Sequence, residues 1–230
     1  DLPGIYSLSP YTQEEIIARE FVLSNGLDGI LNIVDAANIE RNLYLTMQLI
    51  ALGLPMVIAL NFIDDCRAQG IQIDCQAMSD LLGVRVIPIS ARRGENMDTL
   101  LDAVVGEMRP PAHQPDYLHG VGAAIRRVSG LLDGLSLRRA SLPFYAAKLL
   151  EGDSHVYEAV ALPDPVRHEI SHVALSLCSH QNSTDNQMIM ADAIYDFIES
   201  VVKQCYIRPK NPPLTITERI DRVVMNLSLI

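Results

Sequence analysis

The stretch Met56-Val-Ile-Ala-Leu-Asn61-Phe-Ile-Asp64 joins an apolar run to an Asn-x-x-Asp pattern. The run follows Pro55 and has the length and composition of a strand that is covered on both faces of a parallel sheet. Two polar residues, Asn61 and Asp64, lie where that strand ends. The stretch therefore predicts a strand over residues 55–61 that delivers two polar side chains to one end of a sheet.

The spacing of Asn61 and Asp64 suits the recognition of guanine. Guanine presents adjacent N–H donors on its Watson–Crick edge, and one carboxylate with two acceptor oxygens can accept from both. Adenine does not supply that pair, so a carboxylate site can reject the wrong base by several kcal/mol. Asp64 is the candidate base-reading residue, while Asn61 would tie the loop together and touch the base. In the alternative interpretation, both residues only cap the following helix.

Two further patterns lie at distances that fit this interpretation. In phosphoryl-transfer proteins a strand-end Asp such as Asp1 of Asp1-Leu-Pro-Gly4 helps to hold Mg²⁺, usually through water. Gly4 would let a backbone N–H approach the γ-phosphate, and loss of that phosphate would release the loop. Ser90-Ala91-Arg92 follows a predicted strand, where a backbone N–H can donate to the guanine carbonyl. Taken alone, the first pattern also fits a Pro-Gly turn, and the second fits a helix-entry loop capped by Ser90 or Asn96.

The chain contains no Gly-x-x-x-x-Gly-Lys-Ser/Thr phosphate loop. That loop supplies the backbone cradle and the lysine that bind the β- and γ-phosphates. We therefore expect this polypeptide to be the later part of a GTPase that begins upstream, and to bind GTP poorly without turnover when alone. Ile5 stands where many GTPases place a water-orienting glutamine, so slow hydrolysis that needs another group or ion is expected.

The remaining apolar runs predict alternating strands and helices in the first half of the chain. Strands are expected over residues 29–35, 55–61 and 84–89, and helices over 12–25, 39–52, 62–69, 74–82 and 96–108. This alternation indicates a parallel sheet with crossover helices. The fold class is therefore α/β: a P-loop-GTPase-like, mostly parallel sheet, incomplete at its N-terminus, followed by a small all-α domain.

A proline-rich segment, Arg109-Pro-Pro-Ala-His-Gln-Pro115, interrupts this pattern and indicates a linker. The expected domains are a partial GTPase domain over residues 1–112 and a helical domain over residues 113–230. Helices are expected in the second domain over 117–135, 144–151, 154–161, 164–180, 184–206 and 215–227, with no convincing strand.

Composition narrows the classes of function. The 230 residues are 49% hydrophobic and 20% charged, which is ordinary for a globular chain. The net charge of −10 argues against a nucleic-acid partner, which needs a basic face. The cysteines show no CxxC spacing and are interpreted as reduced thiols or small core residues: Cys66, Cys75, Cys178 and Cys205. No apolar stretch reaches the roughly 18 to 20 residues that span a bilayer.

A competing motif, His168-Glu-Ile-Ser-His172, matches the His-Glu-x-x-His pattern of zinc proteases. Two imidazoles one helical turn apart would bind Zn²⁺, with Glu169 as general base. No clear third ligand follows, although His180 or Asp185 can be proposed, so a half-solvated helix face and incidental metal binding are the competing interpretations. A GTPase of ribosome assembly and a truncated product without catalysis also stay open.

The residues resemble one family closely, the ferrous iron transport protein B (FeoB) family of bacterial iron importers. The resemblance rests on segments spread over most of the chain: 1–8, 35–46, 61–64, 90–94, 146–153 and 191–198. Among them, Glu40-Arg-Asn-Leu-Tyr-Leu-Thr46 is far more specific than the general GTPase patterns. Phe62 stands where GTPases have Lys and the family often has Met. Ile194 stands where the family usually has Arg, and Phe144-Tyr145 stands where it usually has Arg-Trp. These differences weaken the transfer of family properties to the helical half of the chain.

The resemblance implies a cytosolic GTPase domain, a helical domain that helps to retain GDP, and a polytopic membrane domain, absent here, that carries Fe²⁺. The site would lie at the cytoplasmic face of the bacterial inner membrane, and this chain itself would be soluble. Nucleotide state would couple or regulate iron uptake. The implied partners are a guanine nucleotide, the membrane domain of the same transporter and small cytosolic proteins, with no nucleic acid.

The implied cofactors are GTP or GDP and Mg²⁺, with a monovalent cation as a further candidate. No catalytic residue is assigned. Asp1 would bind Mg²⁺ through water, and the nucleotide-binding residues would be Asp1, Leu2, Pro3, Gly4, Asn61, Phe62, Ile63, Asp64, Ser90, Ala91 and Arg92.

Overall fold

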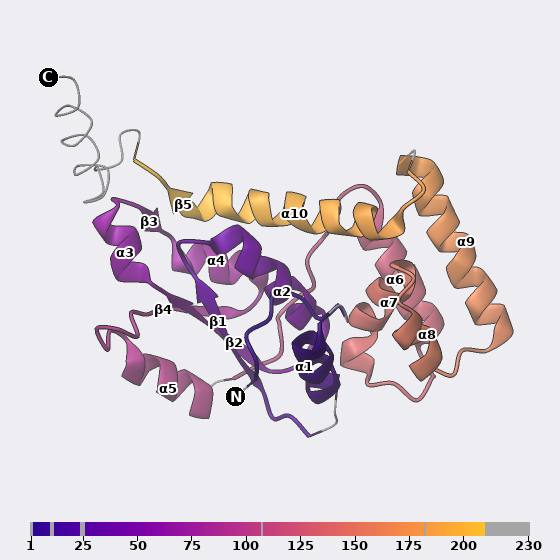
Figure 1. Cartoon of the computed structure of the whole chain (residues 1–230), viewed down its shortest axis with the longest axis horizontal. Coiled ribbons are helices and arrows are strands. Elements are labelled where there is room, and N and C mark those ends of the chain that lie inside the picture. Colours follow the sequence, from indigo (N-terminus) through magenta and orange to yellow (C-terminus); the bar gives the residue numbers. More distant parts are fainter. Residues whose placement is uncertain (1, 10–11, 24–25, 107, 182, 210–230) are drawn as a thin grey trace, which may run out of the picture.

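The computed structural model describes residues 2–9, 12–23, 26–106, 108–181 and 183–209. A sheet flanked by helices lies beside a group of packed helices, and one long helix runs across both parts (Figure 1). Strands β1 (Ile30–Asp35), β2 (Met56–Asn61) and β4 (Arg85–Pro88) form a parallel sheet in the order β1-β2-β4. The predicted fold class, a mostly parallel α/β sheet followed by a helical part, is confirmed.

The helices of the first half alternate with the strands as expected. They are α1 (Gln13–Leu23), α2 (Ile39–Ala51), α3 (Ile63–Ala68), α4 (Cys75–Leu82) and α5 (Met97–Gly106). The second half contains α6 (Val121–Leu132), the 3₁₀ turn η1 (Arg139–Ser141), α7 (Leu142–Leu150), α8 (Ser154–Ala159), α9 (Asp164–Gln181) and α10 (Asn186–Cys205). The helix expected over residues 215–227 lies outside the described residues.

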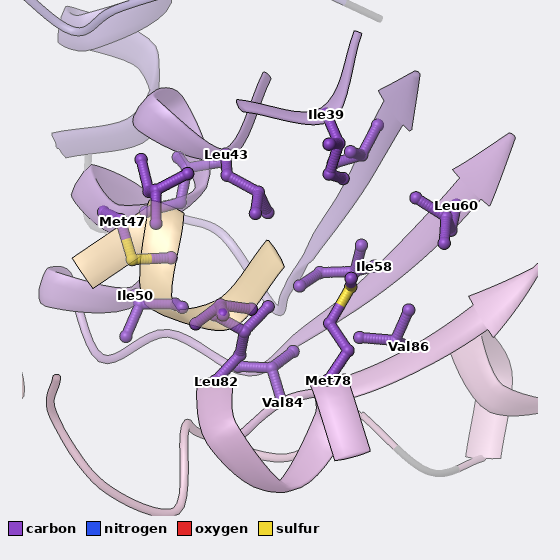
Figure 2. Packing of buried hydrophobic residues seen from close by; sticks show 14 of the residues in the cluster. Ile39, Leu43, Met47, Ile50, Ile58, Leu60, Met78, Leu82, Val84 and Val86 are labelled. Atoms are coloured by element: carbon purple, nitrogen blue, oxygen red, sulfur yellow. The ribbon is translucent and has the colours of Figure 1, made fainter. Parts of the chain in front are cut away.

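Strand β2 is the centre of the core. Its residues 56–60 are at most 1% exposed, because helices cover both faces of the sheet at this strand. Figure 2 shows Ile58 and Leu60 on the side that packs against α2 and α4. Val57 and Ala59 pack on the opposite side against α5. A strand that is buried on both faces has a continuous apolar sequence, and for this reason the apolar run predicted the position of β2 well.

The expectation of an all-helical second half was wrong at one place. A short strand, β5 (Tyr206–Ile207), follows α10 and pairs antiparallel with β3 (Gln72–Ile73) of the first half. Two-residue strands produce no apolar periodicity, so no sequence pattern reveals them. This pairing attaches the end of α10 to the sheet-containing part, as Figure 1 shows.

Helix α10 contributes to both hydrophobic cores. Its first turns supply Ile189, Met190 and Ala193 to the core of the helical part. Its later turns supply Ile198 and Val201 to the core beneath the sheet. The predicted boundary at residues 112/113 stays a prediction, and the two parts share this helix wherever the boundary is drawn.

The proline-rich segment is fixed to the first part of the structure. The N–H of Met56 donates to the carbonyl oxygen of Arg109 at 3.0 Å, and the N–H of Ala112 donates to the carbonyl oxygen of Gly83 at 2.8 Å. The side-chain amide of Gln114 donates to a carbonyl at the end of α2. The segment therefore connects the two parts along a defined path.

The edge of the sheet at β1 keeps an exposed apolar face. Leu31 and Ile33 are 40% and 62% exposed, whereas Val57 and Ala59 of the neighbouring strand are covered on the corresponding face by α5. Leu101 and Val105, on the outer side of α5, are also exposed. Within the described part of the chain, the outer edge of β1 has no partner strand, and the face that carries Leu31 and Ile33 is exposed.

Gly53 gives a direct test of the junction between the two parts. It has φ +63° at the end of α2, and a Cβ there would lie 2.4 Å from the carbonyl oxygen of Ala140. We predict that Gly53→Ala lowers the free energy of unfolding by about 3 kcal/mol, of which about 1 comes from the positive φ and the rest from overpacking against the backbone. Urea unfolding monitored by circular dichroism measures the change.

Gly94→Ala is the matched control. Gly94 has φ +69°, but a Cβ there meets nothing within 4 Å. This variant should lose only about 1 kcal/mol. Equal losses in the two variants would show that the close approach of Ala140 does not matter for stability.

Candidate functional site

The carboxyl ends of β2 and β4 bring two of the predicted loops together. The N–H of Ile89 donates to the carbonyl oxygen of Leu60 at 2.8 Å, and the N–H of Ile63 donates to the carbonyl oxygen of Ile89 at 3.3 Å. Residues 61–64 and 90–92 therefore meet at one edge of the sheet, as the sequence predicted.

The side chain of Asn61 ties these loops to each other. Its Oδ1 accepts from the N–H of Phe62 at 2.9 Å and from the N–H of Ala91 at 3.1 Å, which uses both lone pairs of one amide oxygen. The first bond supports an unusual backbone, because Phe62 has φ +65° and is not a glycine. The Phe62 ring is 42% exposed at this corner. The N–H of Ala91, one of the backbone donors of the predicted loop 90–92, is thus engaged by Asn61 in this structure.

Asp64 is a buried carboxylate held by two arginines. Its side chain is 4% exposed; its Oδ2 accepts from Nη2 of Arg92 at 2.6 Å and forms an ion pair with Arg93, whose Nε lies 3.0 Å away. Arg92 also contacts Asp65 at 2.9 Å and is itself 65% exposed. Arg93 was not among the predicted site residues, although it lies next to Arg92 and within the segment 90–94 on which the resemblance rests.

The surroundings of Asp64 favour its ionised form. The hydrogen bond from Arg92 and, to a smaller extent, the Ser90 hydroxyl lower the pKa of Asp64 from 3.8 to about 2, against the opposing effect of burial. Ser90 is itself buried, and its hydroxyl oxygen accepts from the N–H of Arg93 at 3.3 Å. The corner therefore presents a charged, acceptor-only group at neutral pH, which is what recognition of two N–H donors requires.

The third predicted loop lies at the start of the described chain. Leu2 is half-buried against the core, whereas Pro3 and Gly4 are exposed, and the space beside Gly4 is open. Further along, the N–H of Leu8 donates to Oε1 of Gln48 on α2 at 2.6 Å. Asp1, the predicted Mg²⁺ residue, lies outside the described residues, so the joint role of the three loops stays a prediction.

Two metal sites were predicted from the sequence, one for Mg²⁺ at Asp1 and a competing one for Zn²⁺ at His168 and His172. Among the described residues no group of three or more His, Cys, Asp or Glu side chains could hold a metal ion. Mg²⁺ needs no such cage, because it keeps several waters and binds through one or two carboxylates plus nucleotide phosphates. In the competing zinc motif, His168 and His172 are exposed, and Glu169 is paired with Arg127. In the described residues, Glu169, the predicted general base of this motif, is therefore engaged in an ion pair.

Two family models match this chain, one in each half. A family model described as ferrous iron transport protein B matches residues 1–104, and a model of the FeoB cytosolic helical domain matches residues 117–207. The structure aligns with a GDP-bound variant of the S. thermophilus FeoB G-domain at a TM-score of 0.85 and 38% identity, covering 90% of this chain and 80% of that one. This chain belongs to the FeoB family. It carries the G-domain region and the cytosolic helical domain of FeoB, as the resemblance indicated.

Further curated relatives of this FeoB chain are much longer than the chain itself. The mGMPPNP-bound NFeoB from S. thermophilus aligns at a TM-score of 0.81 with 38% identity, over 92% of this chain and 80% of that one. The Fe(2+) transport protein A/Fe(2+) transporter FeoB fusion protein of Porphyromonas gingivalis is 34% identical over 97% of this chain and 28% of its own length. The Fe(2+) transporter FeoB of Escherichia coli K12 is 32% identical over 98% and 29%. This chain thus spans less than a third of these curated relatives.

The described part of this FeoB chain offers no candidate for a membrane-crossing helix, since none of its helices combines sufficient length with sufficient apolarity.

The charge state of Asp64 is open to direct measurement. Because its folded pKa lies below 3.8, its contribution to stability is complete above pH 3.8 and is lost as the pH falls toward about 2. We predict that ¹³C NMR of the Asp64 carboxyl shows its midpoint near the lower value, and that Arg92→Ala moves the midpoint upward. A midpoint near 3.8 in the unaltered protein would contradict the ion pairs.

Proposed function

We propose that this chain is the guanine-nucleotide-binding part of a bacterial Fe²⁺ transporter, and that its nucleotide state couples or regulates Fe²⁺ uptake by the rest of that protein. The main support is the corner formed by Asn61, Asp64 and Ser90 on a FeoB fold. Solved relatives contain GDP and mGMPPNP, and curated relatives are named Fe(2+) transporters.

In this proposal Asp64 accepts from the two N–H donors of the guanine Watson–Crick edge. Arg92 is mostly exposed, so its guanidinium can leave the carboxylate for solvent when the base enters. Asn61 keeps the two loops together, the Phe62 ring covers the base, and a backbone N–H of the loop that begins with Ser90 and Ala91 donates to the guanine carbonyl. Ile63 and Arg92 are the remaining proposed nucleotide-binding residues of these two loops.

The proposed reaction is GTP hydrolysis in a protein that also carries a phosphate loop. Asp1 would hold Mg²⁺ through water, and the backbone of Leu2, Pro3 and Gly4 would approach the γ-phosphate. When bound, Mg²⁺ would neutralise the charge that develops on the phosphates. Ile5 packs against the core and is apolar, so it orients no water; a monovalent cation is proposed to assist instead. No residue of this chain is assigned as a catalytic base.

The open edge at β1 supports a longer G domain. Leu31 and Ile33 leave an apolar surface on which further strands and a helix with a phosphate loop can pack. The same proposal places the site at the cytoplasmic face of the inner membrane. Its partners would be the membrane domain of the same transporter and small cytosolic proteins, and the net charge of −10 argues against nucleic acid.

Base selectivity tests the role of Asp64. In a version of the protein that includes a phosphate loop, Asp64→Asn should shift preference from guanosine to xanthosine nucleotides, because xanthine offers an acceptor where guanine offers an amino donor. The ratio of dissociation constants for GDP and XDP should change at least 100-fold. Asp65→Asn is the matched control, since Asp65 also contacts Arg92 but is more exposed. Unchanged discrimination in Asp64→Asn would remove the basis of the assignment.

The affinity of the present chain tests the importance of the phosphate loop. With the base corner but without the β- and γ-phosphate cradle, we expect only weak binding of GTP and no turnover. Titration with a fluorescent GTP analogue measures this. Sub-micromolar affinity for the 230-residue chain would be inconsistent with the expectation.

A further inference from the structure

A cavity of about 330 Å³ lies between α2 of the sheet-containing part and the helices α6, α7 and α10. These elements meet where the two parts of the structure join (Figure 1). Of the described residues that line the cavity, none belongs to the loops at residues 61–64 and 90–92. The cavity is therefore separate from the proposed guanine site, and its volume falls within the usual range of pockets for small ligands.

Most of the cavity wall is apolar and rich in sulfur and aromatic groups. Met47 of α2 and Met190 of α10 contribute thioethers, while Tyr117 and Phe144 contribute aromatic rings. Thioether sulfur and aromatic rings both interact favourably with an aromatic ring that packs against them. The composition of the wall therefore favours an aromatic occupant.

One polar atom of the wall lacks a partner. The hydroxyl oxygen of Ser129, on α6, is buried, and within the described part of the chain it makes no hydrogen bond. A buried hydroxyl without a partner destabilises the folded state. A ligand that carries one hydroxyl group of its own would supply the missing hydrogen bond.

The other polar groups of the wall already have partners. Oε1 of Gln48 accepts from a backbone N–H, and the side-chain amide of Gln114 donates to a carbonyl of α2. Nζ of Lys148 lies 3.3 Å from the hydroxyl of Ser9. The charges on and near the wall are compensated in ion pairs, which are Lys148–Glu151 at 2.7 Å, Arg126–Asp116 at 2.9 Å and Arg19–Asp153 at 2.7 Å. A buried water needs two to four polar partners, so this wall suits an uncharged organic molecule better than a water or an ion.

We propose that this cavity binds a small, uncharged aromatic molecule that carries one hydroxyl group. The ring would pack among Met47, Phe144 and Met190, and the hydroxyl would form a hydrogen bond with Oγ of Ser129. Gln114 and Arg126, which also line the cavity, are exposed, so the cavity reaches the surface beside them and a ligand can enter there. This proposal does not depend on the proposed nucleotide site.

NMR of the methionine methyl groups tests the proposal on the 230-residue chain. With β-naphthol as the probe, the ¹³C-methyl signals of Met47 and Met190 should shift saturably. The signals of Met56 and Met78, which are buried outside the cavity, should stay in place. Naphthalene sulfonate, which is charged, should shift none of these signals. Absence of saturable shifts at Met47 and Met190, or equal binding of the sulfonate, would overturn the proposal.

The hydrogen bond is tested by Ser129→Ala, which removes the hydroxyl and keeps the cavity. The affinity for β-naphthol should fall about 5-fold, the usual effect of losing one neutral hydrogen bond. The affinity for naphthalene, which has no hydroxyl, should not fall. An unchanged affinity for β-naphthol in Ser129→Ala would contradict the proposed role of this hydroxyl.

The location is tested by filling the cavity. Ala147 of α7 lines it, and the added atoms of Ala147→Leu would enter the empty volume, so the saturable shifts should be lost. Ala123→Leu is the matched control, because Ala123 is an exposed residue of α6 outside this cavity. Ala51→Leu fills the cavity from α2 and replaces Ala147→Leu if that variant does not fold. Undiminished binding of β-naphthol in a folded, filled variant would overturn the proposal.

Discussion

The burial of β2 on both faces and its pairing on both edges fix the geometry of the whole site. The ladder with β1 places Asp35 opposite Asn61, and the ladder with β4 places Leu60 opposite Pro88. A slip of one residue would turn the side chains of β2 to the opposite faces of the sheet and exchange its two packed surfaces. Because each surface is filled by different helices, that slip is costly, and the loops after β2 and β4 meet at one place.

The polar corner at that place contains a buried charge, which lowers stability unless it is compensated but provides the acceptor of the proposed base-binding site. A buried carboxylate such as Asp64 would destabilise the fold if it stood alone, so two arginines and a hydroxyl compensate it here. Asp64 also lies in the first turn of α3, where the helix dipole favours negative charge. Asn61 is uncharged, and its amide oxygen accepts hydrogen bonds from two backbone N–H groups. Asn61 therefore holds the two loops together, and Asp64 supplies the negative charge of the corner. The two roles belong to different residues.

Local patterns predicted the parts of this structure that local physics determines. The apolar run of β2 predicted the bounds of this strand to within a few residues, because a strand buried on both faces needs a continuous apolar sequence. The glycines after α2 and α4 predicted where these helices end, because a glycine readily adopts the positive φ found there. The joining of loops 61–64 and 90–92 followed from the rule that parallel strands end at one edge. By contrast, β3 and β5 exist only because α10 ends beside residue 72, and the Arg19–Asp153 pair depends on packing between distant helices. Arg93 was missed because its reach toward Asp64 depends on the turn at residues 90–95.

Two kinds of contact join the sheet to the helical part, and they differ in how strongly they depend on distance and angle. Helix α10 contributes apolar side chains to both cores. Near the end of this helix the thiols of Cys66 and Cys205 are buried, and desolvation is the main cause that raises their pKa values. Both cysteines therefore act as small core residues. Apolar burial is non-directional and tolerates small sliding motions. The contacts of Arg19 with Asp153 and of Ser9 with Lys148 are directional and weaken steeply with distance and angle. Helix α10 therefore holds the two parts together, and the polar contacts add direction to the packing of α1 and Ser9 against residues 148–153.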